Sequence, residues 1–294
     1  MSGLAPRVVV VSRRSELDEL LIRHGTMAAA AYFLRQRGRD LDEVMARHAA
    51  LQAALTTVGG AIPAAWRRGQ VGRDDLARFL FAPEDIVVAV GQDGLVANVA
   101  KYLDGQPVIG IDPEPGRNPG VLVRHQAGEV AGLLAAGSYA TRRLTMVAAT
   151  LDDGQELLGL NEVYLGHPTH QSSRYLLSTS DGQRERQSSS GVVVGTGTGA
   201  TGWCASIARQ LTASPALPEP EEQALCWFVR EAWPSPATGV TLTAGRLSVG
   251  ERLELIAEGE RTVVFADGVE SDHLSLAWGQ RVRVEVASRR LCLA

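Results

Sequence analysis

The chain has 294 residues, 45% of them hydrophobic and 21% charged, which is the composition of a globular protein with one large domain or two modest ones. Its formal net charge of −4 argues against a broad nucleic-acid-binding surface. No signal peptide is recognisable and no apolar stretch reaches the roughly 18 residues of a membrane span, so we expect a cytoplasmic protein without a membrane partner.

The first half of the chain alternates apolar runs with helical patterns. Three runs are typical of buried parallel strands: Arg7–Ser15, Asp85–Val90 and Pro107–Asp112. Apolar spacings of three and four predict a long helical region from about Glu16 to Leu55, and a further helix that begins at the sequence NVAKYL. This alternation predicts an open parallel α/β domain of Rossmann-like type over residues 1–137.

After about Gly137 the helices give way to short alternating segments separated by turn residues. This pattern predicts an all-β, sandwich-like domain over residues 138–294. A polar, proline-rich stretch from Ala213 to Pro236 interrupts it and is predicted to be a loop with one short helix.

The numbers and positions of lysine and cysteine residues limit the kinds of phosphate-binding and metal-binding site that we expect. Lys101 is the only lysine, so a Walker A phosphate loop is absent and any side chain that holds a phosphate is expected to be an arginine. Cys204, Cys226 and Cys292 are far apart and form no CxxC pair. We expect them to be small buried residues rather than members of a disulfide or zinc site.

A glycine turn, Gly91-Gln92-Asp93-Gly94, follows the second apolar run. We expect its glycines to take backbone conformations that other residues avoid, and the amides after them to favour an anion at a helix N-terminus. A carboxylate beside phosphates repels them unless it accepts a proton from a hydroxyl or reaches a metal ion. The alternative is an aspartate that caps an ordinary turn, which is a common arrangement.

The segment GVVVGTGTGATGW, Gly191–Trp203, runs from a strand into small residues with three threonines. Their hydroxyls and the glycine amides form a compact set of donors for a flat ligand. Trp203 either stacks on a base or packs in the core. Asn161 and Glu162 lie at a strand end, where they either face a ligand or form an exposed end.

Five motifs follow one another along the chain: Gly-x-Asp-Gly, a strand with Gly-Ile-Asp, Asn-Glu, Thr-x-Thr-Gly-x-Thr and a late Asp-Gly. In this order they resemble the motifs of the NAD kinases, and most closely those of the mitochondrial type. The resemblance covers nearly the whole chain. It implies a kinase that transfers the γ-phosphate of ATP to the 2′-hydroxyl of the adenosine ribose of NAD, giving NADP. It also implies Mg²⁺ bound mainly through the ATP phosphates rather than by protein ligands, and a homodimer or homotetramer.

The resemblance also implies roles for individual residues. Asp93 matches the aspartate beside the acceptor hydroxyl and is the expected catalytic residue. The residues that match NAD-binding positions are Gly94, Asn161, Glu162, Thr196, Thr198, Gly199, Thr201, Trp203 and Asp267. Those expected at the donor phosphates are Gly91, Gln92, Arg13, Arg14 and Arg117.

Two positions of the glycine turn depart from the family pattern. Gln92 stands where the family has a second glycine, and Leu95 where a threonine usually follows. If residue 92 needs a positive φ, a glutamine there is strained. Two alternatives stay open: a related kinase that acts on another nucleoside, sugar or lipid hydroxyl, and a non-catalytic nucleotide-binding protein. The tail that returns to the first domain in many NAD kinases is expected to be absent or very short.

Overall fold

The computed structural model describes residues 5–117, 120–137 and 140–294, and the chain divides into two compact units. The first unit contains residues 1–141 and 292–294, and the second contains residues 142–291. The division lies close to Gly137, where helices give way to strands in the sequence. In the described part of the chain, no helix is both long and apolar enough to cross a membrane.

The first unit is built on a parallel sheet, as the sequence predicts. Its strands lie in the order β2-β1-β3-β4 and pair in parallel. Their bounds are β1 (Arg7–Ser12), β2 (Arg67–Gly72), β3 (Asp85–Val90) and β4 (Pro107–Ile111). The sequence does not predict β2, because it is a polar edge strand in which only Val71 is buried.

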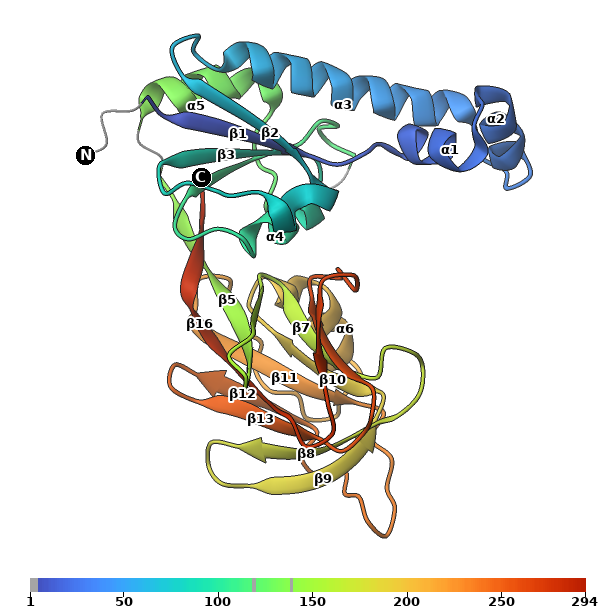
Figure 1. Cartoon of the computed structure of the whole chain (residues 1–294), viewed down its shortest axis with the longest axis vertical. Coiled ribbons are helices and arrows are strands. Elements are labelled where there is room, and N and C mark those ends of the chain that lie inside the picture. The colour runs from blue at the N-terminus through green and yellow to red at the C-terminus, as the bar shows by residue number, and fades with distance from the viewer. Residues whose placement is uncertain (1–4, 118–119, 138–139) are drawn as a thin grey trace. The chain divides into compact units, whose positions relative to one another are not determined.

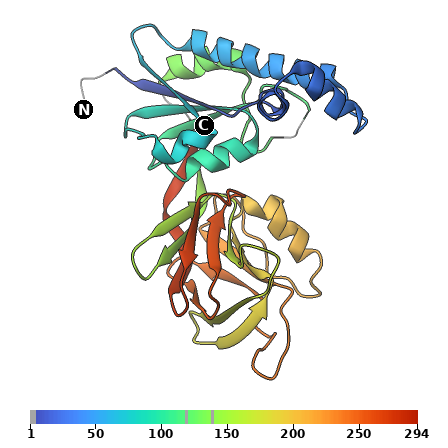
Figure 2. The ribbon, with the colours of Figure 1, turned by 45° about the vertical axis from the view of Figure 1, so that its right-hand side comes forward.

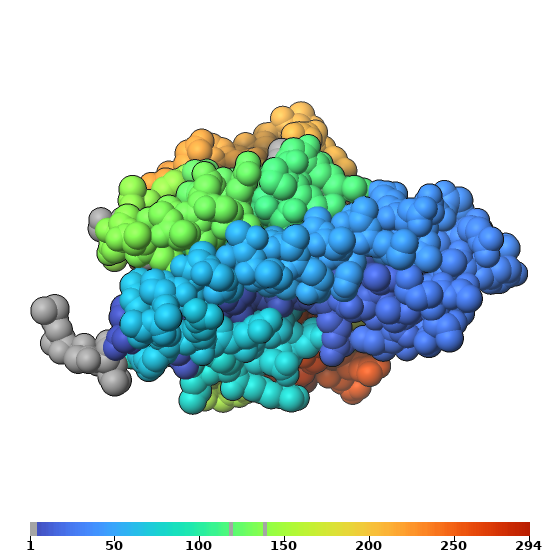
Figure 3. All heavy atoms as spheres, turned by 90° about the horizontal axis from the view of Figure 1, so that it is seen from above, coloured from blue at the N-terminus to red at the C-terminus, as the bar shows by residue number. Residues whose placement is uncertain are grey.

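Helices cover both faces of this sheet (Figure 1). On one face, α3 (Leu41–Ala61) and α5 (Val130–Ala136) join the apolar cluster formed by β1, β3 and β4. Figure 3 shows these two helices side by side along the surface of the unit. On the other face lies α4 (Asp93–Ala100), and one 3₁₀ turn, η1 (Arg73–Arg78), packs against it.

The helical region predicted from Glu16 to Leu55 is three helices rather than one. These are α1 (Glu16–His24), α2 (Met27–Arg35) and α3. The breaks occur where Gly25 and Gly38 take left-handed conformations, with φ of 76° and 65°. The three helices keep a small apolar cluster of their own, which includes Leu17, Leu34 and Val44.

The helix predicted at NVAKYL begins earlier, at Asp93, and ends at Ala100. Gln92 is its N-cap, with an extended backbone at φ −103° and ψ 168°. The Gly-Gln-Asp-Gly segment is therefore the entry and first turn of α4 and not a separate turn before it. As a consequence, the side chain of Asp93 projects from the N-terminus of a helix.

The second unit is a β-sandwich, as predicted (Figure 2). One sheet has the order β12-β11-β10-β7-β14-β15, and the facing strands are β5, β6, β8, β9, β13 and β16. Apolar side chains from both sheets form one core, with Val147, Leu177 and Val194 among its fully buried members. The strands are β5 (Arg142–Leu151), β6 (Glu156–Gly159), β7 (Glu162–Gly166), β8 (Ser173–Thr179), β9 (Arg184–Ser189), β10 (Gly191–Gly195), β11 (Ala224–Arg230), β12 (Ala244–Ser248), β13 (Arg252–Ala257), β14 (Thr262–Ala266), β15 (His273–Leu276) and β16 (Arg281–Leu293).

The stretch from Ala213 to Pro236 is not the loop with a short helix that the sequence predicts. It contains β11, which pairs with both β10 and β12. The run ALCWFV is buried along its whole length. Because prolines lie on either side of it, the surrounding sequence resembles a loop and the strand is not predicted. The short helix of the region, α6 (Trp203–Ala208), comes before the stretch instead.

The chain ends within the first unit. Cys292 and Leu293, at the end of β16, pair in parallel with β4, and the amide of Ala294 donates to the carbonyl of Val108 at 2.9 Å. All three cysteines are buried and free, as expected from their spacing.

Candidate functional site

The carboxylate of Asp93 holds the loop that follows β4. Its Oδ2 accepts a hydrogen bond from the amide of Val121 at 2.8 Å, and its Oδ1 accepts from the amides of Leu122 and Val123 at 2.9 and 3.0 Å. The loop lies so close to β4 that a Cβ on Gly110 would be 2.2 Å from the carbonyl oxygen of Leu122. Asp93 is therefore half-buried and does not turn into bulk solvent.

Asp93 keeps capacity for one more hydrogen bond. An ionised carboxylate offers about four acceptor positions. Within the described residues, three amides occupy two of them on Oδ1 and one on Oδ2, so the position left over is on Oδ2. A substrate hydroxyl could donate to that atom without breaking the contacts that hold the loop.

The backbone of the glycine turn is ordinary. Neither Gly91 nor Gly94 takes the left-handed conformation that we expected from the sequence. A Cβ on Gly94 would meet no atom within 4 Å, and one on Gly91 would meet only the side chain of Leu95, at 3.1 Å. Since Gln92 is extended, a glutamine carries no left-handed strain at this position. The departure from glycine at residue 92 is thus compatible with the helix entry.

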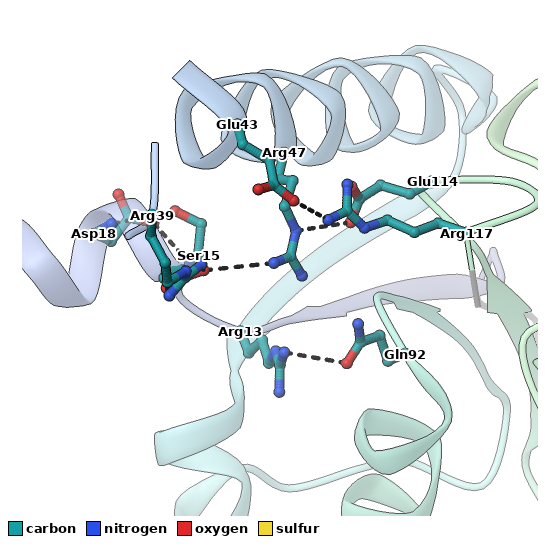
Figure 4. A network of polar contacts seen from close by, with 10 residues as sticks. Arg13, Ser15, Asp18, Arg39, Glu43, Arg47, Gln92, Glu114 and Arg117 are labelled. Carbon is teal, nitrogen blue, oxygen red and sulfur yellow. Dashed lines mark hydrogen bonds and ion pairs between the residues drawn. The ribbon is translucent and has the colours of Figure 1, made fainter. Parts of the chain in front are cut away.

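A cavity of about 320 Å³ lies beside this turn within the first unit. Three arginines line it: Arg13 and Arg14, which follow β1, and Arg47 of α3. Figure 4 shows the contact of Arg13 with the Oε1 of Gln92, at 3.3 Å. The remaining lining residues are Ser15, Glu16, Glu19, Leu51, Val90, Gly91, Pro113 and Glu114. Sequence reasoning misses Arg47, because it lies inside a long helix away from every motif.

Arg117 does not line this cavity, although we expected it at the donor phosphates. It forms ion pairs with Glu43 of α3 and, at 3.7 Å, with Glu114. Its hydrogen bond with Glu43 raises the pKa of the guanidinium above its ordinary value. Arg117 therefore ties α3 to the segment after β4.

In the second unit, Asp267 holds the Asn161–Glu162 turn in the same way. Its Oδ2 accepts from the amide of Leu160 at 2.9 Å, and its Oδ1 accepts from those of Asn161 and Glu162 at 2.7 and 3.3 Å. Asp267 does this at φ 52°, a conformation that few non-glycine residues adopt. A Cβ on Gly199 would lie 2.2 Å from the carbonyl oxygen of Asn161, so three segments meet at this turn.

Glu162 is half-buried at the start of β7, beside this turn. Burial, and secondly the negative charge of Asp267, raise the pKa of Glu162 to about 7. A carboxyl group that titrates near neutral pH can donate or accept a hydrogen bond according to its protonation state, and such groups are frequent at functional sites. Glu162 is thus the residue of this turn with the most unusual electrostatics.

The protein itself uses most of the threonine hydroxyls that the sequence suggests as ligand donors. The Oγ1 of Thr196 donates to the carbonyl of Leu160 at 2.5 Å and accepts from the amides of Thr198 and Gly199 at 3.1 and 3.3 Å. The Oγ1 of Thr201 donates to the carbonyl of Thr198 at 2.9 Å. By contrast, the Oγ1 of Thr198 is buried and has no partner among the described residues. Among the described contacts of the three hydroxyls, that of Thr198 keeps both its donor and its acceptor capacity, and that of Thr201 keeps its acceptor capacity.

Trp203 lies at the surface and not in the core, with 38% of the residue exposed. Its ring is nearly parallel to that of Tyr164, with centroids 6.1 Å apart and an angle of 17° between the planes. These two rings and Phe265 line a cavity of about 420 Å³ within the second unit, together with His167, His170 and His273. Aromatic rings that line a cavity can stack on a flat ligand, so the position of Trp203 favours ligand stacking over packing in the core.

Comparison with profiles of known protein families gave no match, and comparison with the curated proteins gave none either. Solved structures do match. An NAD kinase from Archaeoglobus fulgidus in complex with ATP superposes with a TM-score of 0.57 at 17% identity, over 98% of this chain and 92% of that one. Yeast NADH kinase complexed with NADH superposes with a TM-score of 0.61 at 12% identity, over 99% and 83%. The chain has the fold of the NAD kinases. At these identities the likeness establishes the fold alone.

Each half of the NAD kinase fold gathers a separate group of the predicted residues. In the first unit, Gly91, Gln92, Arg13 and Arg14 surround one cavity, and Asp93 follows directly in the chain. In the second unit, contacts join the residues Asn161, Glu162, Thr196, Thr198, Gly199, Thr201 and Asp267.

Proposed function

We propose that the chain is a kinase of the NAD kinase family, of the mitochondrial type, which transfers the γ-phosphate of ATP to the 2′-hydroxyl of the adenosine ribose of NAD. The observation that carries the proposal is that the carboxylate of Asp93 keeps one acceptor position, on Oδ2. The preceding residue, Gln92, lines a cavity that contains three arginines. Phosphoryl transfer needs a proton acceptor for the attacking alcohol and positive charge at the donor phosphates.

The donor is proposed to enter as MgATP, with Mg²⁺ held mainly by the phosphates. Gly91, Gln92, Arg13 and Arg14 are the proposed phosphate contacts, while Arg117 supports the cavity wall through Glu114. Because the transition state of phosphoryl transfer is largely dissociative, Asp93 has only to orient the hydroxyl and take its proton late.

The acceptor is proposed to be NAD. Glu162, Thr198 and Trp203 have side chains with capacity for a ligand: a carboxyl that titrates near pH 7, an unused hydroxyl and an exposed ring. Thr196 and Asp267 are proposed to shape the site through the backbone groups that they bind. Gly94, Asn161, Gly199 and Thr201 complete the proposed contacts, in a cytoplasmic homodimer or homotetramer.

One observation favours a second candidate, a non-catalytic nucleotide-binding protein. Asp93 has a structural task, since it accepts three amides of the loop after β4. The presence of a carboxylate at this position is therefore explained without catalysis, and the test has to separate the two roles.

The test uses purified protein with NAD, ATP and Mg²⁺ and follows NADP by a coupled assay. Asp93→Asn is expected to lower turnover about 10²–10⁴-fold while NAD binding is kept. Gly120→Ala is the matched control: its Cβ would lie 2.8 Å from the carbonyl oxygen of Val123 and 3.3 Å from Oδ1 of Asp93, so it displaces the same loop while it keeps the carboxylate and does not crowd Oδ2, the proposed proton acceptor. Gly120→Ala is expected to retain most of the turnover.

Equal losses in the two variants would show that Asp93 acts only through the loop. NAD binding by the wild type without NADP formation would favour the non-catalytic candidate. Turnover with another alcohol and not with NAD would assign the protein to a related kinase activity.

A further inference from the structure

We infer that Arg47 binds the phosphates of an oligophosphate ligand in the first-unit cavity, and that Glu16 and Glu114 hold this arginine until the ligand arrives. The inference rests on the proposed function, because it assigns a residue to the donor site. It adds a helix, α3, to a site that the motifs place only on the loops after β1, β3 and β4.

Arg47 is held loosely by two carboxylates at once. Its Nη1 lies 3.4 Å from Oε2 of Glu16. Its Nε lies 3.4 Å from Oε2 of Glu114, a contact that Figure 4 shows. Well-formed arginine–carboxylate hydrogen bonds are about 2.7–2.9 Å long, so neither contact fully engages the guanidinium. Since that group has five N–H donors, most of its capacity remains for a ligand.

Each of these carboxylates has a second arginine that stays when Arg47 turns away. Glu16 accepts two hydrogen bonds from Arg39, one of them 2.9 Å long, and Glu114 pairs with Arg117 at 3.7 Å. The hydrogen bond from Arg39 is also the main cause that lowers the pKa of Glu16, and the charge of Arg47 is a lesser one. Glu16 therefore remains ionised and paired after Arg47 is released, which keeps the cost of release small.

Arg47 is better placed to bind a phosphate strongly than Arg13 and Arg14, which are both exposed residues. Its side chain is 29% exposed, whereas that of Arg14 is 60% exposed and pairs with Asp74 at 3.6 Å. Charge interactions are screened less away from bulk solvent. Because a ligand has to compete with two carboxylates for Arg47, a multiply charged chain of phosphates is favoured over a single phosphate group.

Calorimetric titration of the full chain with inorganic tripolyphosphate, and separately with MgATP, tests the inference. Arg47→Met is expected to raise the dissociation constant for tripolyphosphate about ten- to a hundredfold. Arg35→Met is the matched control, because it removes the same charge at a residue that is exposed at the end of α2 and is not among those that line the cavity. It is expected to leave the dissociation constant unchanged within about twofold.

A second variant is expected to tighten tripolyphosphate binding, a result that loss of folding could not produce. Glu114→Gln frees Arg47 from one partner and is expected to tighten tripolyphosphate binding several-fold. Glu19→Gln removes the same charge from the cavity wall, but Glu19 makes no described contact with Arg47, so its effect is expected to be smaller. If Arg47→Met proves unfolded by circular dichroism, Arg47→Lys replaces it, because it keeps the charge and loses the planar fork.

The inference is overturned if the wild type does not bind tripolyphosphate, if Arg47→Met binds it as tightly, or if Glu114→Gln weakens binding. Failure of the proposed function is a different result. If tripolyphosphate binding depends on Arg47 while the wild type forms no NADP from NAD and ATP, the phosphate site stands and the NAD kinase activity is rejected.

Discussion

Asp93 in the first unit and Asp267 in the second each accept hydrogen bonds from three consecutive backbone amides. Their surroundings differ. Three arginines and three glutamates line the cavity next to Asp93, whereas the neighbour of Asp267 is Glu162, whose pKa it helps to raise. The comparison teaches that a motif aspartate can be a structural clamp, a carboxylate that fixes a turn or loop through its backbone amides, so that its presence alone does not demonstrate a chemical task.

The two clamps also differ in backbone conformation. Asp93 is the first residue of α4, where the helix N-terminus stabilises a negative charge. Asp267 is at φ 52°, in the left-handed region that aspartate and asparagine adopt more readily than other non-glycine residues. Its three hydrogen bonds to the Leu160–Glu162 amides hold it in this conformation.

The largest expected effect comes from removing either clamp. Asp93→Asn and Asp267→Asn are each expected to lower the free energy of unfolding by about 2–4 kcal/mol, because an amide nitrogen cannot accept the N–H bonds that an oxygen accepts. Thermal unfolding measures the loss. Asp75→Asn, at an exposed aspartate of η1, is the control and is expected to change little. A loss in only one of the two clamps would end their structural equivalence.

Two threonines of the second unit allow a structural hydroxyl to be compared with one that is proposed to bind a ligand. Thr196→Val removes a hydroxyl with three partners and is expected to cost about 2–3 kcal/mol of stability. Thr198→Val removes a hydroxyl without a described partner, so it is expected to leave stability nearly unchanged and to weaken NAD binding. Unfolding and equilibrium binding of NAD, measured on both variants, check the pair. Equal destabilisation by both would contradict the assignment.

The acidic surroundings of Asp267 predict a dependence of stability on pH. The pKa of Glu162 in the folded protein, about 7, is above its ordinary value of 4.5, so the folded state binds a proton that the unfolded chain releases between these pH values. Stability should therefore fall by on the order of 1–2 kcal/mol as pH rises from about 4.5 to 7. Glu162→Gln should remove this fall. Melting temperatures of both proteins across that range test it, and parallel curves would contradict it.

The smallest expected effect is at Gln92. Its backbone is unstrained and its exposed contact with Arg13 is 3.3 Å long, so Gln92→Gly is expected to change stability by only a few tenths of a kcal/mol. The Michaelis constant for ATP should change less than about twofold, because the amides at the start of α4 stay in place. A large gain in ATP affinity would show that the glutamine side chain obstructs the cavity beside Asp93.

The local sequence pattern predicts the two kinds of domain and the buried parallel strands, but it misses two strands, β2 and β11. The apolar runs of β1, β3 and β4 are readable because burial on both faces leaves little room for polar residues. The edge strand β2 lacks that signal, and β11 is masked by the prolines around it. The same holds for the site. Asp93 belongs to a motif and is therefore a candidate from the sequence, whereas Arg47, which lines the cavity, lies in a helix whose position depends on packing alone.

The sequence by itself determined the three apolar strands of the first unit, the change from an α/β to an all-β half, and which motif aspartates and threonines follow apolar runs. These features follow from residues that are neighbours in the chain. Only the tertiary structure decided which polar groups are already occupied, because the amides that Asp93 and Asp267 bind are 28–30 and 105–107 residues away in sequence. Such partners meet only when strands pair and loops pack, and hydrogen-bonding capacity can be assigned only after they have met.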